Sequence, residues 1–267
     1  VCPVGALTSK DFRFTMRAWE LFTTSSVCPG CSTGCNVEVH HAQGEIWRLV
    51  PRENLQVNKY WMCDEGRFTY KDVRHKRLTS ARLGAGRGQP AQITSVDKAV
   101  AFAAERLERL ASQGGTIGLV YSAQTTNEAL FALSQVAAKL AARGASVRAY
   151  VTGTAARPER ADKILRSADT NPNTAGAKLL AGAGAGDANA LLADLKGGKL
   201  KGLWMVGADL PLNEQALFDV APLVDGLDLF ICQAVQDSPI LRRAHVQLPA
   251  AAWAEIDGTF TNATHLV

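Results

Sequence analysis

The feature of this sequence with the clearest chemistry is a group of cysteines near its beginning. The chain has six cysteines, and four of them lie close together: Cys28, Cys31, Cys35 and Cys63. In the spacing C-x2-C-x3-C-x27-C, three thiols can wrap one face of a metal centre while the fourth closes the site from a distant segment. A [4Fe-4S] cluster takes four thiolates, and Gly30 and Gly34 would let backbone amides approach its sulfurs. The spacing therefore favours such a cluster.

Two other uses of these cysteines fit the spacing less well. Structural zinc usually takes two short pairs of ligands, whereas here the second pair is absent and a third cysteine joins the first pair. Disulfides would suit a small secreted chain, and neither the length of 267 residues nor the lack of a signal-peptide pattern favours them. A zinc-stabilised interaction module without redox chemistry stays open as the alternative.

The elements that must position the cysteines change in character near residue 90. Before this point, residues 13–21 alternate like a strand, and residues 37–40 and 46–50 flank Ala42-Gln43-Gly44 as a predicted hairpin. The glycine-rich residues 84–90 are expected to form a linker. The first part is thus predicted to be a small cysteine-rich β domain.

Helical and strand patterns alternate in the second part. Apolar residues recur at helical spacing from Ala99 to Leu110, and Thr125 with Glu128 fits a capping box at the start of the next helix. Strands are predicted at residues 116–121, 147–151, 203–206, 229–232 and 246–248. This alternation predicts an α/β domain with a Rossmann-like parallel sheet and helices on its faces. Residues 152–199 are too rich in Gly and Ala for assignment, and a phosphate loop is not expected there because no strand precedes the glycines.

Composition excludes several classes of function. No apolar run approaches the ~18 residues that span a bilayer, so any link to a membrane is expected to come through partners. The net charge is +4, with a dense basic stretch at residues 71–77, but no nucleic-acid-binding motif or aromatic interleaving accompanies it. Nucleic acid is therefore not an expected partner. The start at Val1, without Met, indicates a fragment or a processed product.

Several longer motifs resemble one protein superfamily. The stretches CPGCSTGCNV, RLVPREN, VNKYWMCDEGRF and LPAAAWAEIDGTFTN are similar to the iron-sulfur domain and neighbouring α/β region of molybdopterin oxidoreductases. The opening CPVGALTSKDFRFTMRAWEL resembles, more narrowly, the large iron-sulfur subunit family of bacterial respiratory NADH:quinone oxidoreductase (complex I). The resemblance implies an upstream iron-sulfur segment at 1–24, a [4Fe-4S] domain at 25–83 and an α/β scaffold at 84–267.

The sequence differs from the catalytic members of the superfamily at positions that concern binding of the molybdenum cofactor. Those members typically carry, two residues after the fourth cluster cysteine, a lysine that relays electrons to the pterin, whereas Asp64 and Glu65 follow Cys63 here. Cys232 lies in an apolar stretch and is expected to be an inert core cysteine. We therefore expect neither molybdopterin nor a catalytic residue in this chain. A fragment of a molybdopterin-dependent enzyme, such as a NAD-linked formate dehydrogenase, remains the alternative.

The resemblance also implies partners and a location. It implies other peripheral-arm subunits of complex I, including a flavin-containing, NADH-oxidising subunit, on the cytoplasmic side of the bacterial inner membrane. In the family, the cysteine of CPVGAL completes another [4Fe-4S] cluster whose remaining ligands lie upstream, so Cys2 is expected to need an upstream segment. Some relatives lack the four clustered cysteines and still respire, which implies a structural role for this cluster rather than an obligatory relay.

Histidines and aromatic residues complete the prediction. His40 and His41 lie in the predicted hairpin and are expected to be structural, because four cysteines already fill the ligand set. A group of aromatic side chains near the cysteines is expected to pack around the cluster and exclude water: Trp19, Trp47, Tyr60 and Trp61.

Overall fold

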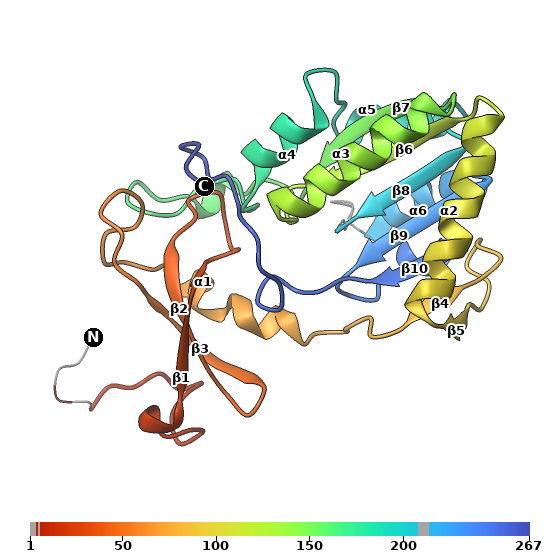
Figure 1. Ribbon diagram of the computed structural model, residues 1–267. Helices are drawn as coiled ribbons and strands as arrows, with labels where there is room; N and C mark the ends of the chain where they lie inside the picture. Colours follow the sequence, from red (N-terminus) through yellow and green to blue (C-terminus); the bar gives the residue numbers. More distant parts are fainter. Residues whose placement is uncertain (1–3, 5, 208–213) are drawn as a thin grey trace.

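The structure is a computed structural model that describes residue 4, residues 6–207 and residues 214–267 (Figure 1). Three strands form a small antiparallel sheet in the order β1-β2-β3: β1 (Phe22–Val27), β2 (Asn36–Ala42) and β3 (Glu45–Pro51). Strands β2 and β3 confirm the predicted hairpin. Its turn residues, Gln43 and Gly44, both have positive φ, as tight two-residue hairpin turns require.

Residues 13–21 do not form the predicted strand. They form turns and a short 3-10 helix, η1 (Ala18–Glu20), and the first strand begins at Phe22. The alternating pattern predicts a strand only where one face becomes buried. Here both Phe14 and Trp19 are exposed, at 92% and 80%, so the alternation has no core to face and the prediction is wrong.

Seven strands form the larger sheet in the order β5-β4-β10-β9-β8-β6-β7. Their bounds are β4 (Ala81–Leu83), β5 (Gln92–Thr94), β6 (Thr116–Ser122), β7 (Ser146–Thr152), β8 (Gly202–Val206), β9 (Leu229–Ala234) and β10 (Val246–Pro249). All five strands predicted after residue 115 are confirmed. Strands β7, β6, β8, β9 and β10 run parallel. Strand β7 is added on one side of β6, and β8, β9 and β10 follow one another on its other side. This is the strand order of a doubly wound α/β fold.

The edge of the larger sheet corrects the prediction of a parallel sheet. Strand β4 pairs antiparallel with both β10 and β5. The glycine-rich segment 84–90 is the connection between β4 and β5, and a connection this short can join only antiparallel neighbours. The sheet is therefore mixed, and β4 belongs to it although the sequence placed residues 81–83 with the cysteine domain.

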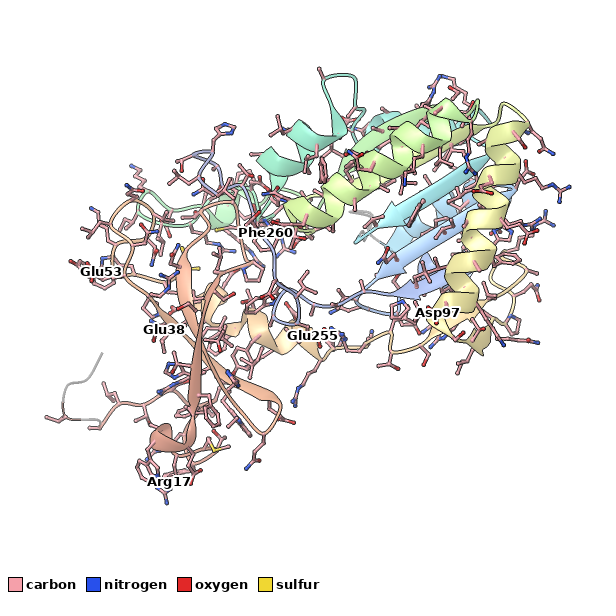
Figure 2. The ribbon with its side chains drawn as sticks, viewed as in Figure 1. Arg17, Glu38, Glu53, Asp97, Glu255 and Phe260 are labelled. Carbon is pink, nitrogen blue, oxygen red and sulfur yellow. The ribbon has the colours of Figure 1, made fainter. Side chains whose placement is uncertain are left out.

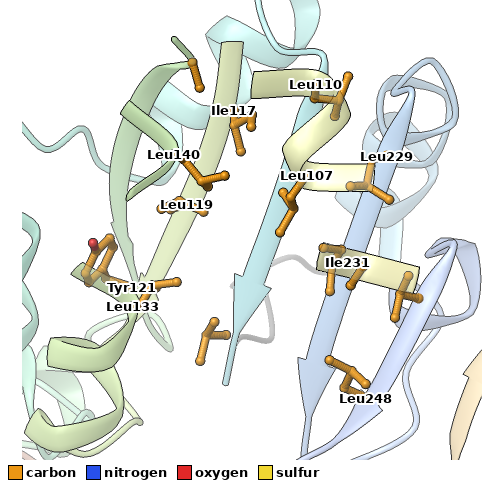
Figure 3. Packing of buried hydrophobic residues seen from close by; sticks show 14 of the residues in the cluster. Leu107, Leu110, Ile117, Leu119, Tyr121, Leu133, Leu140, Leu229, Ile231 and Leu248 are labelled. Carbon is orange, nitrogen blue, oxygen red and sulfur yellow. The ribbon is translucent and has the colours of Figure 1, made fainter. Parts of the chain in front are cut away.

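Helices cover both faces of the larger sheet. Their bounds are α2 (Val96–Ser112), α3 (Asn127–Ala142), α4 (Thr174–Ala181), α5 (Ala188–Lys196) and α6 (Glu214–Asp225), with short 3-10 helices η3 (Pro158–Arg160) and η4 (Leu241–Arg243). Strand β6 shows the two-sided burial, because Ile117 and Leu119 face the core beneath α2, α3 and α4, whereas Val120 faces the core beneath α5 and α6. Figure 3 shows the first of these cores. No helix among the described residues combines the length and the apolar character that crossing a bilayer requires.

The start of helix α3 differs by one residue from the prediction. Thr126, not Thr125, is the N-cap, and its hydroxyl accepts a hydrogen bond from the backbone N–H of Ala129. Glu128 is not part of a capping box, because its carboxylate accepts hydrogen bonds from the backbone N–H and the hydroxyl of Thr259, each at 2.8 Å. This contact ties the C-terminal segment to the start of α3.

Candidate metal centre

The four cysteines come from two places in the small domain. Three of them lie in the loop between β1 and β2, and Cys63 is the N-cap of a short helix, α1 (Asp64–Phe68), which continues into the 3-10 helix η2 (Thr69–Val73). All four line one cavity of about 1200 Å³ between the small domain and the larger sheet. The structure therefore brings together the four residues that the spacing singled out.

Backbone hydrogen bonds fix the shape of the β1–β2 loop. The N–H of Cys28 donates to the carbonyl of Cys35 at 2.8 Å and closes the base of the loop. Gly34 has a φ of +69°, a backbone conformation that residues with a side chain rarely adopt. The turn at Gly34 leads the chain from Cys31 to Cys35. The loop thus places three thiols on one side of a tight turn.

Two glycines bring backbone amides against the sulfurs. The N–H of Gly30 donates to Sγ of Cys28 at 3.4 Å, and the N–H of Gly66 donates to Sγ of Cys63 at 3.3 Å. A Cβ on Gly66 would lie 3.1 Å from Sγ of Cys28 and 3.3 Å from Sγ of Cys63, so the sulfurs of the loop and of helix α1 approach the same backbone position. Such N–H···S bonds stabilise thiolates and tune iron-sulfur clusters.

Burial favours the protonated form of two of these thiols, Cys28 and Cys35. Cys28 and Cys35 are each 5% exposed, and burial raises the pKa of each thiol to about 12. The neighbouring thiols add to this effect, because a second negative charge in the same cavity is unfavourable. Occupying the site therefore requires a cationic centre that displaces the protons.

The donor set fits a [4Fe-4S] cluster. Four free thiols, one of them partly exposed, face one cavity, and two backbone N–H groups point at two of the sulfurs. Among the residues that the structure describes, no three Cys, His, Asp or Glu side chains converge on a point that could hold one metal ion. A single zinc ion at ~2.3 Å from each sulfur needs ligands within about 4 Å of one another. A cube of iron and sulfide is a larger group and joins ligands that lie further apart.

An ion-pair network lies beside the cysteines. Glu65 pairs with Arg160 at 3.2 Å and with Arg166, and both arginines come from the segment after β7. The hydrogen bond from Arg166 lowers the pKa of Glu65, and the same bond raises the pKa of Arg166, with a smaller contribution from the Cys63 and Cys31 thiols. A cation from a distant segment therefore lies next to the cysteines.

Two further segments hold the cysteine loop in place, and sequence reasoning missed both. The segment after β7 binds the loop where the N–H of Ser32 donates to the carbonyl of Asp169 at 2.9 Å. The C-terminal segment binds it where the N–H of Ala263 donates to the carbonyl of Ser32 at 2.8 Å. Figure 2 labels Glu255 and Phe260 on this segment, which runs between the two sheets. The first segment had no periodic pattern, so no sequence signal indicated its contacts.

The far wall of the cavity is the carboxyl edge of the larger sheet. Gln124 and Thr125, just after β6, line it, as does Gly207, just after β8. The arrowheads of β8, β9 and β10 point toward the small domain in Figure 1. Doubly wound sheets bind ligands in the crevice where the strand order reverses, which here lies between β6 and β8.

Other residues from the sequence analysis lie away from the cysteines. Trp19, Tyr60 and Trp61 are 80%, 59% and 64% exposed, so the prediction that they pack around a cluster is wrong. Trp253 of the C-terminal segment packs instead against the buried core that contains Cys28 and Cys35. Cys232 is fully buried in β9, as expected of a core cysteine. Cys2 lies outside the described residues.

His40 has a structural partner. Its Nδ1 accepts a hydrogen bond from Nε of Arg48 on the neighbouring strand β3, at 2.9 Å. His41 stacks on Phe22 of β1 and its Nε2 lies 3.0 Å from the Thr24 hydroxyl. Both contacts lie within the small sheet, in agreement with the structural roles expected for the two histidines.

Two family models match the regions that build this site. The model described as "Molybdopterin oxidoreductase Fe4S4 domain" matches residues 22–75, and the model described as "Molybdopterin oxidoreductase" matches residues 167–267. The first match contains the small sheet, α1 and the four cysteines, and the second contains β8 to β10 and the C-terminal segment. These two regions are therefore similar to the corresponding regions of molybdopterin oxidoreductases.

Curated proteins similar to this chain include subunits of NADH-quinone and NADH-ubiquinone oxidoreductases. An NADH-quinone oxidoreductase subunit of Streptomyces coelicolor is 38% identical over 140 residues, which are 51% of this chain and 16% of the relative. The NADH-ubiquinone oxidoreductase 75 kDa subunit of Reclinomonas americana is 31% identical over 178 residues, 65% of this chain and 25% of the relative. The chain thus spans a quarter or less of the length of these relatives. The resemblance to the large iron-sulfur subunit of NADH:quinone oxidoreductase is confirmed.

Proposed function

We propose that this chain is part of an iron-sulfur subunit of NADH:quinone oxidoreductase and that Cys28, Cys31, Cys35 and Cys63 bind one [4Fe-4S] cluster. The observation that carries the proposal is the convergence of four thiols from two segments on one cavity, with backbone N–H groups aimed at two of the sulfurs. The Fe4S4 family model over residues 22–75 and the names of the relatives support it.

The chain's own residues perform the binding and the insulation. The four thiols would hold the cluster as thiolates, the amides of Gly30 and Gly66 would donate hydrogen bonds to two of the ligating sulfurs, and the Arg166–Glu65 ion pair would lie beside them. When bound, the cluster supplies one-electron transfer. The segments that carry Asp169 and Ala263 hold the loop of Cys28, Cys31 and Cys35 through hydrogen bonds to Ser32.

The domain organisation and the partners are part of this proposal. Residues 1–24 would join an upstream iron-sulfur domain, residues 25–83 without strand β4 would form the cluster domain, and residues 84–267 together with β4 would form the scaffold. The chain would assemble with other peripheral-arm subunits, including a flavin-containing, NADH-oxidising subunit, on the cytoplasmic side of the inner membrane. Cys2 would complete a second [4Fe-4S] cluster with an upstream segment. The cluster held here would serve structure more than electron relay, and no molybdopterin would bind.

Metal analysis of anaerobically purified protein tests the ligand set. We expect four irons and four sulfides per chain in the unaltered protein, as the cluster formula states, and loss of both in Cys63→Ala. The matched control is Cys232→Ala, which removes a thiol from β9 outside the cavity and should keep the iron. Full iron and sulfide in Cys63→Ala would refute the assignment, and stoichiometric zinc in place of iron would support the interaction module.

One observation favours a second candidate, a fragment of a molybdopterin-dependent oxidoreductase. The cavity continues from the cysteines to the carboxyl edge of β6 and β8, and its volume of about 1200 Å³ is ample for a large cofactor. Pterin fluorescence after acid oxidation of the purified protein separates the two candidates. A stoichiometric signal would support the molybdopterin enzyme, and its absence from iron-loaded protein would support the respiratory subunit.

A further inference from the structure

A second cavity lies at the amino ends of the parallel strands, at the opposite end of the larger sheet from the cysteines. Its volume is about 360 Å³. The residues just before β9 and β10 form one wall, and the C-terminal half of α2 forms another. Its polar lining comprises Arg87, Arg106, Arg109, Gln113, Asp228 and His245. Because parallel strands place their amino ends at one edge and their carboxyl ends at the other, this cavity is separate from the cluster site.

Positive charge in this cavity exceeds negative charge. Three arginines and a single carboxylate residue, Asp228, line it; the Arg106 guanidinium lies over the Phe102 ring, and Nε of Arg87 donates to the carbonyl of Asp225. Arg106 and Arg109 form no ion pair with any carboxylate in the part of the chain that the structure describes, and the buried Nε of Arg106 has no hydrogen-bond partner there. Arg243, by contrast, is compensated by Asp225. A buried, unmatched guanidinium N–H is costly unless a ligand accepts from it.

His245 adds a neutral donor to the cavity. Its Nδ1 accepts a hydrogen bond from the backbone N–H of Phe230 at 3.0 Å, so the ring proton of the neutral form sits on Nε2. Burial, together with Arg106 and Arg87, lowers the pKa of His245, which keeps the ring neutral. A Cβ on Gly86 would lie 2.8 to 3.1 Å from Nε2, Cε1 and Cδ2 of His245, so glycine, with a φ of +73°, lets the backbone pack against the imidazole ring.

We propose that this cavity binds the phosphate group of a small soluble molecule. Guanidinium groups bind phosphate oxygens in pairs of parallel hydrogen bonds, and three of them with one imidazole N–H can surround a doubly charged anion. The anion would balance the excess charge and supply an acceptor for the Arg106 Nε. The volume lies in the range of small-molecule sites. This proposal does not depend on the cluster or on the proposed function.

Titration calorimetry of the 267-residue chain with inorganic pyrophosphate, and separately with inorganic phosphate, tests the proposal. We expect saturable one-site binding and at least a tenfold loss of affinity in Arg109→Gln, since Arg109 is exposed on its outer side and its replacement leaves the core intact. Arg106→Gln should lose affinity as well. The matched control is Lys98→Gln, which removes one positive charge from the same helix outside the cavity and should bind like the unaltered protein.

Three results would overturn the inference. Equal affinity in Arg109→Gln and Lys98→Gln would show that any binding is non-specific attraction to the basic surface. Displacement of pyrophosphate by double-stranded DNA, with loss of that DNA binding in Arg109→Gln, would assign the cavity to nucleic acid instead of a small molecule. Absence of binding in the unaltered, folded chain would refute it directly.

Discussion

At the scale of single residues, charge is the property that distinguishes this site. The catalytic relatives implied by the resemblance carry a lysine two residues after the last cluster ligand, and this chain carries Glu65. The structure shows that Glu65 does not leave a bare negative charge beside the cysteines, because Arg160 and Arg166 pair with it. Arg166 is the more buried of the two arginines, with a side chain 13% exposed, and its charge is therefore less screened by water.

Arg166 is expected to raise the reduction potential of a bound cluster. Reduction adds a negative charge to the cluster, and a nearby cation stabilises the reduced form. Arg166→Gln should therefore shift the midpoint potential to a more negative value in a redox titration followed by electron paramagnetic resonance, whereas Arg166→Lys should stay near the unaltered protein. The control is Arg143→Gln. Arg143 is the C-cap of α3 and pairs with Glu108 of α2, so this variant removes an equal charge away from the cysteines. Equal midpoints in Arg166→Gln and Arg143→Gln would contradict this role.

At the scale of elements, the contact between α3, α4 and the C-terminal segment decides how the site is closed. Asn127 at the start of α3 donates from Nδ2 to the hydroxyls of Thr259 and Thr261, at 3.0 and 3.1 Å. Asn173, the N-cap of α4, accepts from the N–H of Thr261 and donates to the carbonyl of Thr125. Gly176 lies in α4 against these two asparagines, and a Cβ there would collide with both amide oxygens. The helix therefore carries glycine because of packing.

Gly176→Ala is expected to destabilise the protein although alanine is the better helix former. Intrinsic helix propensity alone favours alanine by ~1 kcal/mol, but forcing a methyl group into this packed network costs about 2 kcal/mol. Urea unfolding followed by circular dichroism should show a lower midpoint with an unchanged slope. Gly184→Ala, where nothing lies within 4 Å of the added Cβ, should stay within about 0.5 kcal/mol of the unaltered protein. A more stable Gly176→Ala variant would show that the network yields without cost.

At the scale of the whole molecule, the two domains have cores of very different size. The larger sheet is packed on both faces by separate clusters of buried side chains, as Figure 3 shows for one face. The small sheet has a core of six buried residues, and two of these, Cys28 and Cys35, are proposed cluster ligands. We therefore expect the small domain to depend on the group proposed to bind its cysteines, and the α/β domain to be independent of it.

Removal of the metal is expected to loosen the small domain alone. In hydrogen exchange measured by mass spectrometry, iron-free protein should lose at least tenfold in protection over residues 28–70 relative to iron-loaded protein, because buried protonated thiols cannot replace metal-ligand bonds. Peptides that cover β6, β8 and β9 should exchange equally in both states and serve as the internal control. Unchanged protection over residues 28–70 would mean that the small core is sufficient without a cluster.

The sequence by itself determined the features that repeat at short range. The spacing of Cys28, Cys31 and Cys35 indicated a tight ligand loop, and the apolar runs of β6, β8 and β9 indicated strands buried on both faces. Both are local patterns, because a loop or a strand is specified by residues a few positions apart. The same local reasoning failed for residues 13–21, where the alternation is present but no neighbouring element supplies a core.

Only the tertiary structure decided what surrounds the cysteines. Glu65 and Arg160 are 95 positions apart in the chain, and Thr33 and Asn262, whose amide donates to the Thr33 carbonyl, are 229 apart. Single polar contacts over such distances leave no periodic trace in a sequence. The antiparallel pairing of β4 with β10 was hidden for the same reason, since strand order and direction depend on which edges meet when the chain folds. The tight loop of Cys28, Cys31 and Cys35 is thus local information, while its electrostatic environment and its closure arise from the packing of distant segments.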